Sequence, residues 1–172
     1  HHYWDLLVAG QPAHERFRTL FGDESRDYGQ ALQSYYANGA PPGWPQTHIS
    51  AYATAHPWED FAETFAHYLH IVDTVEMSAA FGVRARPRTQ DENLALAPVT
   101  FDPYMAPDLS QIIDNWIPLA SLLNNLNRAM GHADAYPFIL TPPVIDKLSF
   151  VNDLVHQAPV AAQLAALQRV SS

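Results

Sequence analysis

The sequence predicts a mainly α-helical protein, and three features carry this prediction. Apolar residues recur every three or four positions over long stretches, most clearly over 57–80 and 109–130. Pro57 suits a first helical position, and Gly82 and Gly131 stand where these two stretches can end. No stretch shows the alternation of apolar and polar residues that is typical of a β-strand. We therefore expect a mainly α fold.

The first expected helices are short and carry aromatic faces. Residues 3–9 are an apolar run that Gly10 can stop, and residues 13–22 place Phe17, Leu20 and Phe21 on one side. Residues 27–38 read as another helix, which groups Tyr28, Leu32, Tyr35 and Tyr36. The segment 39–49 is rich in proline and glycine and is expected to be a loop. The central helix then runs from Pro57 to about Ala80, and its buried stripe is Trp58, Phe61, Phe65, Leu69 and Val72.

The second half is predicted to hold a long connection and three more helices. Residues 83–108 contain several prolines and no sustained period, which indicates an irregular connection. The helix over 109–130 has a clear period, and Pro118 is expected to kink it. Thr141 precedes a helix that reaches about His156, and an Ala/Leu-rich helix is expected from Pro159 to about Gln168. We find no internal repeat and expect a single helical domain over 1–172.

Composition excludes several classes of protein. The 172 residues are 48% hydrophobic, which is typical of a globular chain. Against 18 acidic residues stand 9 basic ones, and the net charge of −9 would be repelled by nucleic acid and by anionic lipid. We expect no nucleic-acid or membrane partner. The absence of cysteine excludes disulfides and thiolate metal ligands within this chain. No signal peptide or bilayer-spanning run is visible, so a cytoplasmic location is expected, and the start without Met suggests a piece of something larger.

The stretch 56–70 holds the residues most suited to chemistry. Helical spacing stacks Glu59, Glu63 and His67 into one stripe beside the buried face. Carboxylates at such a position are costly unless a cation, a metal or a hydrogen-bond donor meets them. With His56 and His70 nearby, the donor set suits zinc or another divalent ion, although one helix cannot complete a site alone. The alternative for the acids is a solvated helix face on which they interact with the helix dipole. The alternative for the histidines, above all His67 and His70, is that they cap or pack.

Glu59 to Glu63, read EDFAE, resembles the third-ligand helix of HExxH zinc metallopeptidases, where the motif runs E-F-F-A-E. Asp60 is a departure, because Phe is common there. The protease domain of anthrax lethal factor and its bacterial relatives share this arrangement. The resemblance implies that Glu59 binds zinc and that Tyr52, seven residues earlier, faces the substrate carbonyl as a catalytic residue; a core tyrosine is the alternative. It casts Glu63 as a residue behind the metal that orients a ligand.

A closer resemblance, along nearly the whole length, is to a family of bacterial zinc-binding metallopeptidases. The matching pieces are YWD at 3–5, LFGDE at 20–24, DYGQAL at 27–32, the helix at 56–70, YPFIL at 136–140 and VIDKLSFVND at 144–153. In that family an HExGH motif precedes YWD, so the resemblance places His1 on the second zinc histidine. The first histidine and the general-base Glu would precede residue 1. The alternative is that His1 and His2 are the remnant of an affinity tag.

The resemblance implies the C-terminal portion of a zincin-like domain, truncated within its HExxH motif and lacking a zinc ribbon. It implies zinc-dependent hydrolysis of a peptide or protein substrate by the parent protein. Zn²⁺ is expected in the full-length protein and weak or absent in these 172 residues, which we expect to be inactive alone. A noncatalytic helical module that pairs Glu59 and Glu63 with a basic partner stays open. A di-iron bundle is disfavoured, because no Glu-x-x-His pair occurs.

Overall fold

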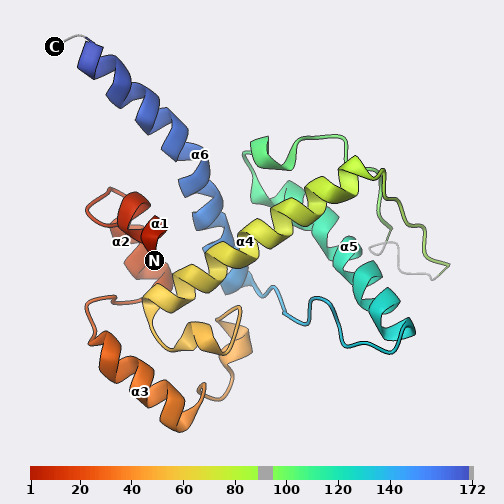
Figure 1. Ribbon diagram of the computed structural model, residues 1–172, viewed down its shortest axis with the longest axis horizontal. Helices are drawn as coiled ribbons and strands as arrows, with labels where there is room; N and C mark the ends of the chain where they lie inside the picture. Colours follow the sequence, from red (N-terminus) through yellow and green to blue (C-terminus); the bar gives the residue numbers. More distant parts are fainter. Residues whose placement is uncertain (89–94, 171–172) are drawn as a thin grey trace. The chain divides into compact units, whose positions relative to one another are not determined.

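A computed structural model of the chain describes residues 1–88 and 95–170, with side chains as far as residue 157. It confirms the mainly α prediction (Figure 1). Six α-helices are described: α1 His2–Leu7, α2 His14–Phe21, α3 Tyr28–Asn38, α4 Pro57–Ala80, α5 Leu109–Ala129 and α6 Pro142–Val170. Short 3₁₀ helices are η1 Trp44–Gln46, η2 Tyr52–Thr54 and η4 Pro103–Met105. In the described ranges, β pairing is limited to one isolated antiparallel bridge between Ala85 and Leu96.

Local chemistry explains where several helices begin and end. The Asp27 carboxylate caps α3 by accepting a hydrogen bond from the backbone N–H of Gln30 at 2.8 Å. Asp108 caps α5 in the same way through Ser110. α3 ends at Asn38, and the next residue, Gly39, has a φ of 73°, in the region that only glycine adopts readily.

Two details differ from the sequence prediction. α6 is one continuous helix from Pro142 to Val170, whereas we expected two helices separated near residue 158. An interior proline removes one backbone hydrogen bond and crowds the carbonyl one turn earlier, but its fixed φ is itself helical, so the helix can continue through Pro159. Leu69, assigned to the buried stripe of α4, is 40% exposed, while Phe61 and Val72 are buried as expected.

The chain divides into two compact units, with the boundary inside α4. The first comprises His1–His67 and Ile139–Ser172, and the second comprises Tyr68–Phe138. Our expectation of a single domain over 1–172 stays a prediction.

Aromatic side chains form the core of the first unit. Phe17 of α2 is fully buried, and its ring lies 4.9 Å from Phe21, 6.0 Å from Phe61 and 6.4 Å from Phe150. Trp4 of α1 packs on Phe17 at 5.7 Å. The cluster therefore joins α1, α2, the start of α4 and α6 around one apolar centre, which fixes the first turn of α4 against the N-terminal helices.

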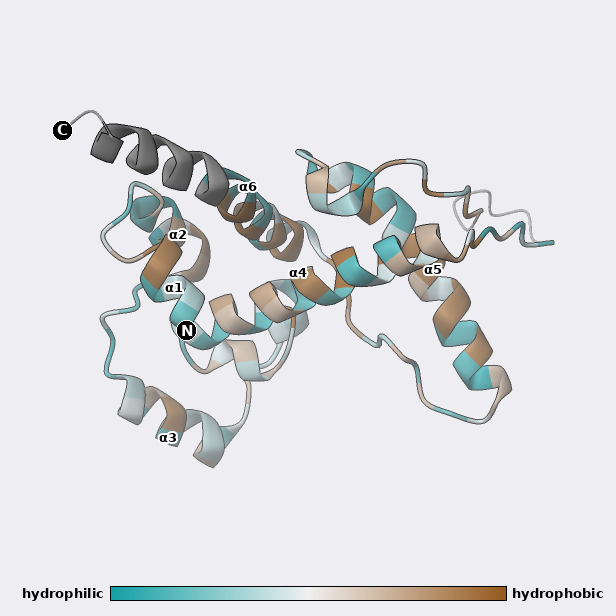
Figure 2. Cartoon of the chain, turned by 45° about the horizontal axis from the view of Figure 1, so that its top comes forward, coloured by the Kyte–Doolittle hydropathy of each residue, from teal (hydrophilic) through white to brown (hydrophobic). Residues whose placement is uncertain are grey.

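The second unit is built from the rest of α4, the connection after it and α5. Its buried apolar residues include Ile71, Val72 and Val75 of α4 and Leu109, Ile112, Ile113, Trp116 and Leu119 of α5. Hydrophobic and hydrophilic residues alternate around α4 in the pattern of an amphipathic helix (Figure 2). Pro118 lies inside α5 without ending it. Among the described helices, none combines the length and the apolar character needed to cross a bilayer.

Candidate metal centre

Two residues far apart in the sequence place ligand-type atoms next to each other in the first unit. Nε2 of His1 lies 3.4 Å from Oε1 of Glu59. Glu59 is in the first turn of α4 and is buried, whereas the His1 side chain is 45% exposed at the N-cap of α1. α1 is held against α4 because the buried Trp4 packs its ring on Trp58, with 5.5 Å between the ring centroids. In Figure 1 the N-terminus accordingly lies beside the start of α4.

The spacing of this pair fits two ligands of one zinc ion. Zinc binds imidazole nitrogen and carboxylate oxygen at about 2.0–2.2 Å, so two such ligands at adjacent corners of a tetrahedron are about 3.3–3.5 Å apart. The observed 3.4 Å falls in this range and exceeds the usual length of a hydrogen bond. The two residues therefore fit zinc in type and in spacing.

Tyr28 completes the surroundings of Glu59, and the sequence analysis did not single it out for this role. Its phenol oxygen donates a hydrogen bond of 2.5 Å to Oε1 of Glu59. This bond to the carboxylate, together with burial, raises the pKa of Tyr28 to about 12, so the phenol keeps its proton. The ring of Tyr28 also lies edge-on to His1 at 6.0 Å. The sequence places Tyr28 in the first turn of a helix, directly after Asp27, but this position does not reveal that Glu59 is its hydrogen-bond partner.

Tyr52, the predicted catalytic residue, lies in η2 and is half-buried. Its ring makes an edge contact with Tyr35 at 5.5 Å, and its hydroxyl hydrogen-bonds with Tyr36. Burial raises the pKa of Tyr52, and the hydrogen bond with Tyr36 and the negative charge of Glu59 raise it further. The phenol is thus a proton donor held within the electrostatic reach of Glu59.

Glu63 lies one turn after Glu59 and contacts the turn that carries Tyr52. Its Oε2 accepts a hydrogen bond of 2.7 Å from Oγ of Ser50, which itself accepts one from the backbone N–H of Ala53 at 3.1 Å. The described contacts therefore join Glu63 to residues 50–53. Its predicted part in orienting a metal ligand stays a prediction.

The remaining histidines of the helix at 56–70 have structural surroundings. His56 is fully buried; its Nδ1 accepts from the backbone N–H of Trp58 at 3.1 Å, and its Nε2 donates to the carbonyl of Arg26 at 3.2 Å. Burial lowers the pKa of His56, consistent with a neutral ring whose two nitrogens are both engaged. His67 is buried and His70 is exposed.

Asp60, the departure from the E-F-F-A-E pattern, is explained by a buried ion pair. Its Oδ2 lies 2.6 Å from Nζ of Lys147 on α6, and both side chains are almost fully buried. Lys147 also donates to the carbonyl of Thr47 at 2.8 Å. Burial raises the pKa of Asp60 to about 6, against the opposing effect of Lys147. The pair joins the first turn of α4 to α6 and to the loop before η2.

His1 and Glu59 would supply two ligands, whereas catalytic zinc sites have three protein ligands and an open position. Within residues 1–88 and 95–170, no three His, Cys, Asp or Glu side chains gather in a way that could hold a metal ion. The structure thus brings the two predicted ligands together.

Comparison with known proteins identifies the class. A family model described as "Putative zinc-binding metallo-peptidase" matches residues 1–154, so the chain belongs to this family.

Relatives in mycobacteria match over most of this chain. The "Uncharacterized protein Rv2568c" of Mycobacterium tuberculosis and the "Uncharacterized protein Mb2598c" of Mycobacterium bovis are each 44% identical to it over 160 residues. These matches cover 91% of this chain but only 44% of each relative, so the chain spans less than half of their length. No solved structure matches it.

Proposed function

We propose that the protein hydrolyses peptide bonds with the help of zinc, and that this chain supplies His1 and Glu59 as two of the three protein ligands. The observation that carries the proposal is the 3.4 Å approach of an imidazole nitrogen and a carboxylate oxygen in a chain of this family. The remaining histidine ligand and the general-base Glu of an HExxH motif would come from residues outside these 172.

We assign each residue of the proposed centre a task. Bound zinc supplies an activated water and polarises the substrate carbonyl. Tyr28 holds the Glu59 carboxylate in one orientation through its hydrogen bond. Tyr52 keeps its proton and donates a hydrogen bond to the carbonyl oxygen as negative charge develops on it. Loss of such a donor typically costs roughly a hundredfold or more in rate.

The test uses a longer chain that includes the residues preceding His1, assayed on casein with other proteases removed. We expect cleavage that a chelator abolishes and added zinc restores, and that Glu59→Gln eliminates. Tyr52→Phe should lower kcat about a hundredfold while the zinc content stays unchanged. A longer chain that holds zinc but cleaves neither casein nor a peptide library contradicts a peptidase function. An unchanged kcat in Tyr52→Phe contradicts the role of Tyr52 alone.

A further inference from the structure

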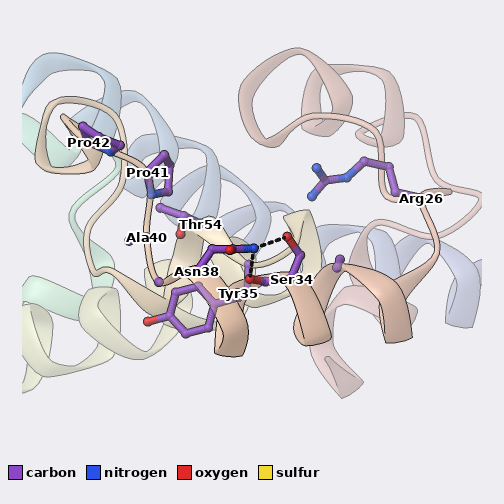
Figure 3. A pocket seen from close by; sticks show the side chains of 11 residues that line it. Arg26, Ser34, Tyr35, Asn38, Ala40, Pro41, Pro42 and Thr54 are labelled. Atoms are coloured by element: carbon purple, nitrogen blue, oxygen red, sulfur yellow. Dashed lines mark hydrogen bonds between the residues drawn. The ribbon is translucent and has the colours of Figure 1, made fainter.

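Two adjoining pockets in the first unit form a groove beside the candidate metal centre. The larger, of about 410 Å³, lies along α3 and includes Ser34 and Tyr35; the smaller, of about 260 Å³, reaches His56 at the start of α4. Arg26, Pro41 and Thr54 line both pockets, so the two are continuous at these residues. We call this feature the Arg26 groove; Figure 3 shows its larger pocket.

Arg26 is a cation without a carboxylate partner among the described residues. The other described basic side chains of this unit are all paired: Arg16 with Asp153 at 2.5 Å, Arg18 with Glu24 at 2.6 Å and Lys147 with Asp60 at 2.6 Å. Figure 3 shows the guanidinium of Arg26 extending back toward Ser34 and Thr54. In a chain of net charge −9, an unpaired arginine in a groove can bind an anion.

The fold fixes the position of Arg26. Its backbone carbonyl accepts the hydrogen bond from Nε2 of the buried His56, which is itself held by the backbone N–H of Trp58. The same histidine lines the smaller pocket. Because the backbone is already ordered, less conformational entropy is lost when the side chain binds a ligand.

The larger pocket has the better surroundings for a carboxylate. The hydroxyl of Ser34 can donate a second hydrogen bond there, and Pro41, Pro42 and Tyr35 supply apolar walls. The smaller pocket includes Asp23, whose Oδ1 accepts from the backbone N–H and the hydroxyl of Ser25, at 2.9 and 2.6 Å. Its negative charge opposes a second carboxylate, which favours the larger pocket for the anion.

We propose that the Arg26 groove binds an extended peptide and that Arg26 receives a carboxylate of that peptide, either an acidic side chain or the C-terminal group. This assignment rests on the proposed function, because the peptide would be the substrate. Tyr35 joins the groove to the centre, since its ring contacts Tyr52 at 5.5 Å, and His56 and Pro57 in the smaller pocket lead directly into the turn that holds Glu59.

Binding of labelled peptides to the 172-residue chain tests this, measured by fluorescence anisotropy with a chelator present. The probes are short Ala/Ser/Gly peptides with one central Glu or Gln, each with a free or an amidated C-terminus. We expect the peptides that carry the recognised carboxylate to bind about tenfold more tightly than their neutral counterparts. A preference for Glu over Gln identifies an acidic side chain, and a preference for the free over the amidated end identifies the C-terminal group.

Variants of Arg26 test whether this residue recognises the carboxylate of the peptide. Arg26→Gln should remove the preference and Arg26→Lys should keep part of it, because the charge stays but the planar fork is lost. Arg84→Gln is the matched control, since it removes one exposed positive charge from the second unit and should change nothing. An undiminished preference in Arg26→Gln, or no preference in the unaltered chain, overturns the assignment. Because no zinc or turnover is involved, this outcome is distinct from a failure of the peptidase proposal.

Discussion

The phenol of Tyr28 donates a hydrogen bond to the same Glu59 oxygen that lies beside Nε2 of His1. This contact joins the first turn of α3 to the first turn of α4, across 31 positions of sequence. Groups that orient a metal ligand in this way typically change metal affinity by about ten- to a hundredfold.

Tyr28→Phe should therefore weaken zinc binding of a longer chain that includes the residues before His1 by about ten- to a hundredfold, since the carboxylate loses the donor that orients it. Competition with a chromophoric chelator measures the affinity. The control is Tyr104→Phe, which removes a similar phenol–carboxylate bond, 2.7 Å to Asp73, in the second unit. Equal zinc affinity in Tyr28→Phe and the unaltered protein would show that Tyr28 does not act on the metal centre.

Breaking the buried ion pair Asp60–Lys147 should destabilise the fold strongly, whereas replacing both residues with apolar ones should destabilise it little. Lys147→Met leaves the buried Asp60 carboxylate without its cationic partner and with the neutral ring of His48, 3.6 Å away, as its neighbour. We expect the free energy of unfolding in urea to fall by about 3–5 kcal/mol. The double variant Asp60→Leu, Lys147→Met should lie much closer to the unaltered chain, because no charge is left buried.

A matched exposed pair provides the comparison. Arg128 is 60% exposed in its ion pair with Asp134, so Arg128→Met should lower the free energy of unfolding far less than Lys147→Met does. If Lys147→Met and Arg128→Met lower the free energy of unfolding by the same amount, the buried ion pair does not stabilise the fold more than an exposed one.

The Glu24 carboxylate should increase the free energy of unfolding of the chain, and this contribution should disappear in acid. Hydrogen bonds from the Arg18 guanidinium, with a further one from His14, hold the pKa of Glu24 at about 2, below the 4.5 of an unperturbed Glu. Because the folded-state pKa is the lower one, the contribution is fully present above pH 4.5 and is lost as the pH falls from 4.5 toward 2.

The measurement is urea unfolding of the unaltered chain and of Glu24→Gln at several pH values. The unaltered chain should be the more stable above pH 4.5, and the difference should close toward pH 2. Glu15→Gln, which changes an exposed carboxylate on α2, should show no such closing difference. A difference that stays constant down to pH 2 would contradict the depressed pKa.

The sequence predicted the helices well because their signals are local. Periodicity and Pro57 placed α4 at 57–80, and the structure has the same bounds. The break expected near residue 158 was wrong because a proline is compatible with continued helix. Leu69 was misplaced because a stripe defined on one helix does not say which part of it another element covers.

The candidate centre was predicted in part, and the reason lies in sequence distance. Family resemblance singled out His1, Tyr52 and Glu59, and the structure brings His1 and Glu59 together. Tyr28 and Lys147 reach their carboxylates from 31 and 87 positions away, and no local pattern encodes such a pairing. Lysine side chains are almost never fully buried unless they are paired, so the residue type of Lys147 gives no sign that it is buried against Asp60.

The most direct measurement is the zinc content of a longer chain that includes the residues preceding His1, purified and freed of loosely held metal. We expect about one zinc per chain, lost in Glu59→Ala and in His1→Ala, and retained in Glu76→Ala, which removes another carboxylate from the same helix. Zinc no higher than background in the longer chain, or full zinc retained by Glu59→Ala, would contradict a metal centre at His1 and Glu59.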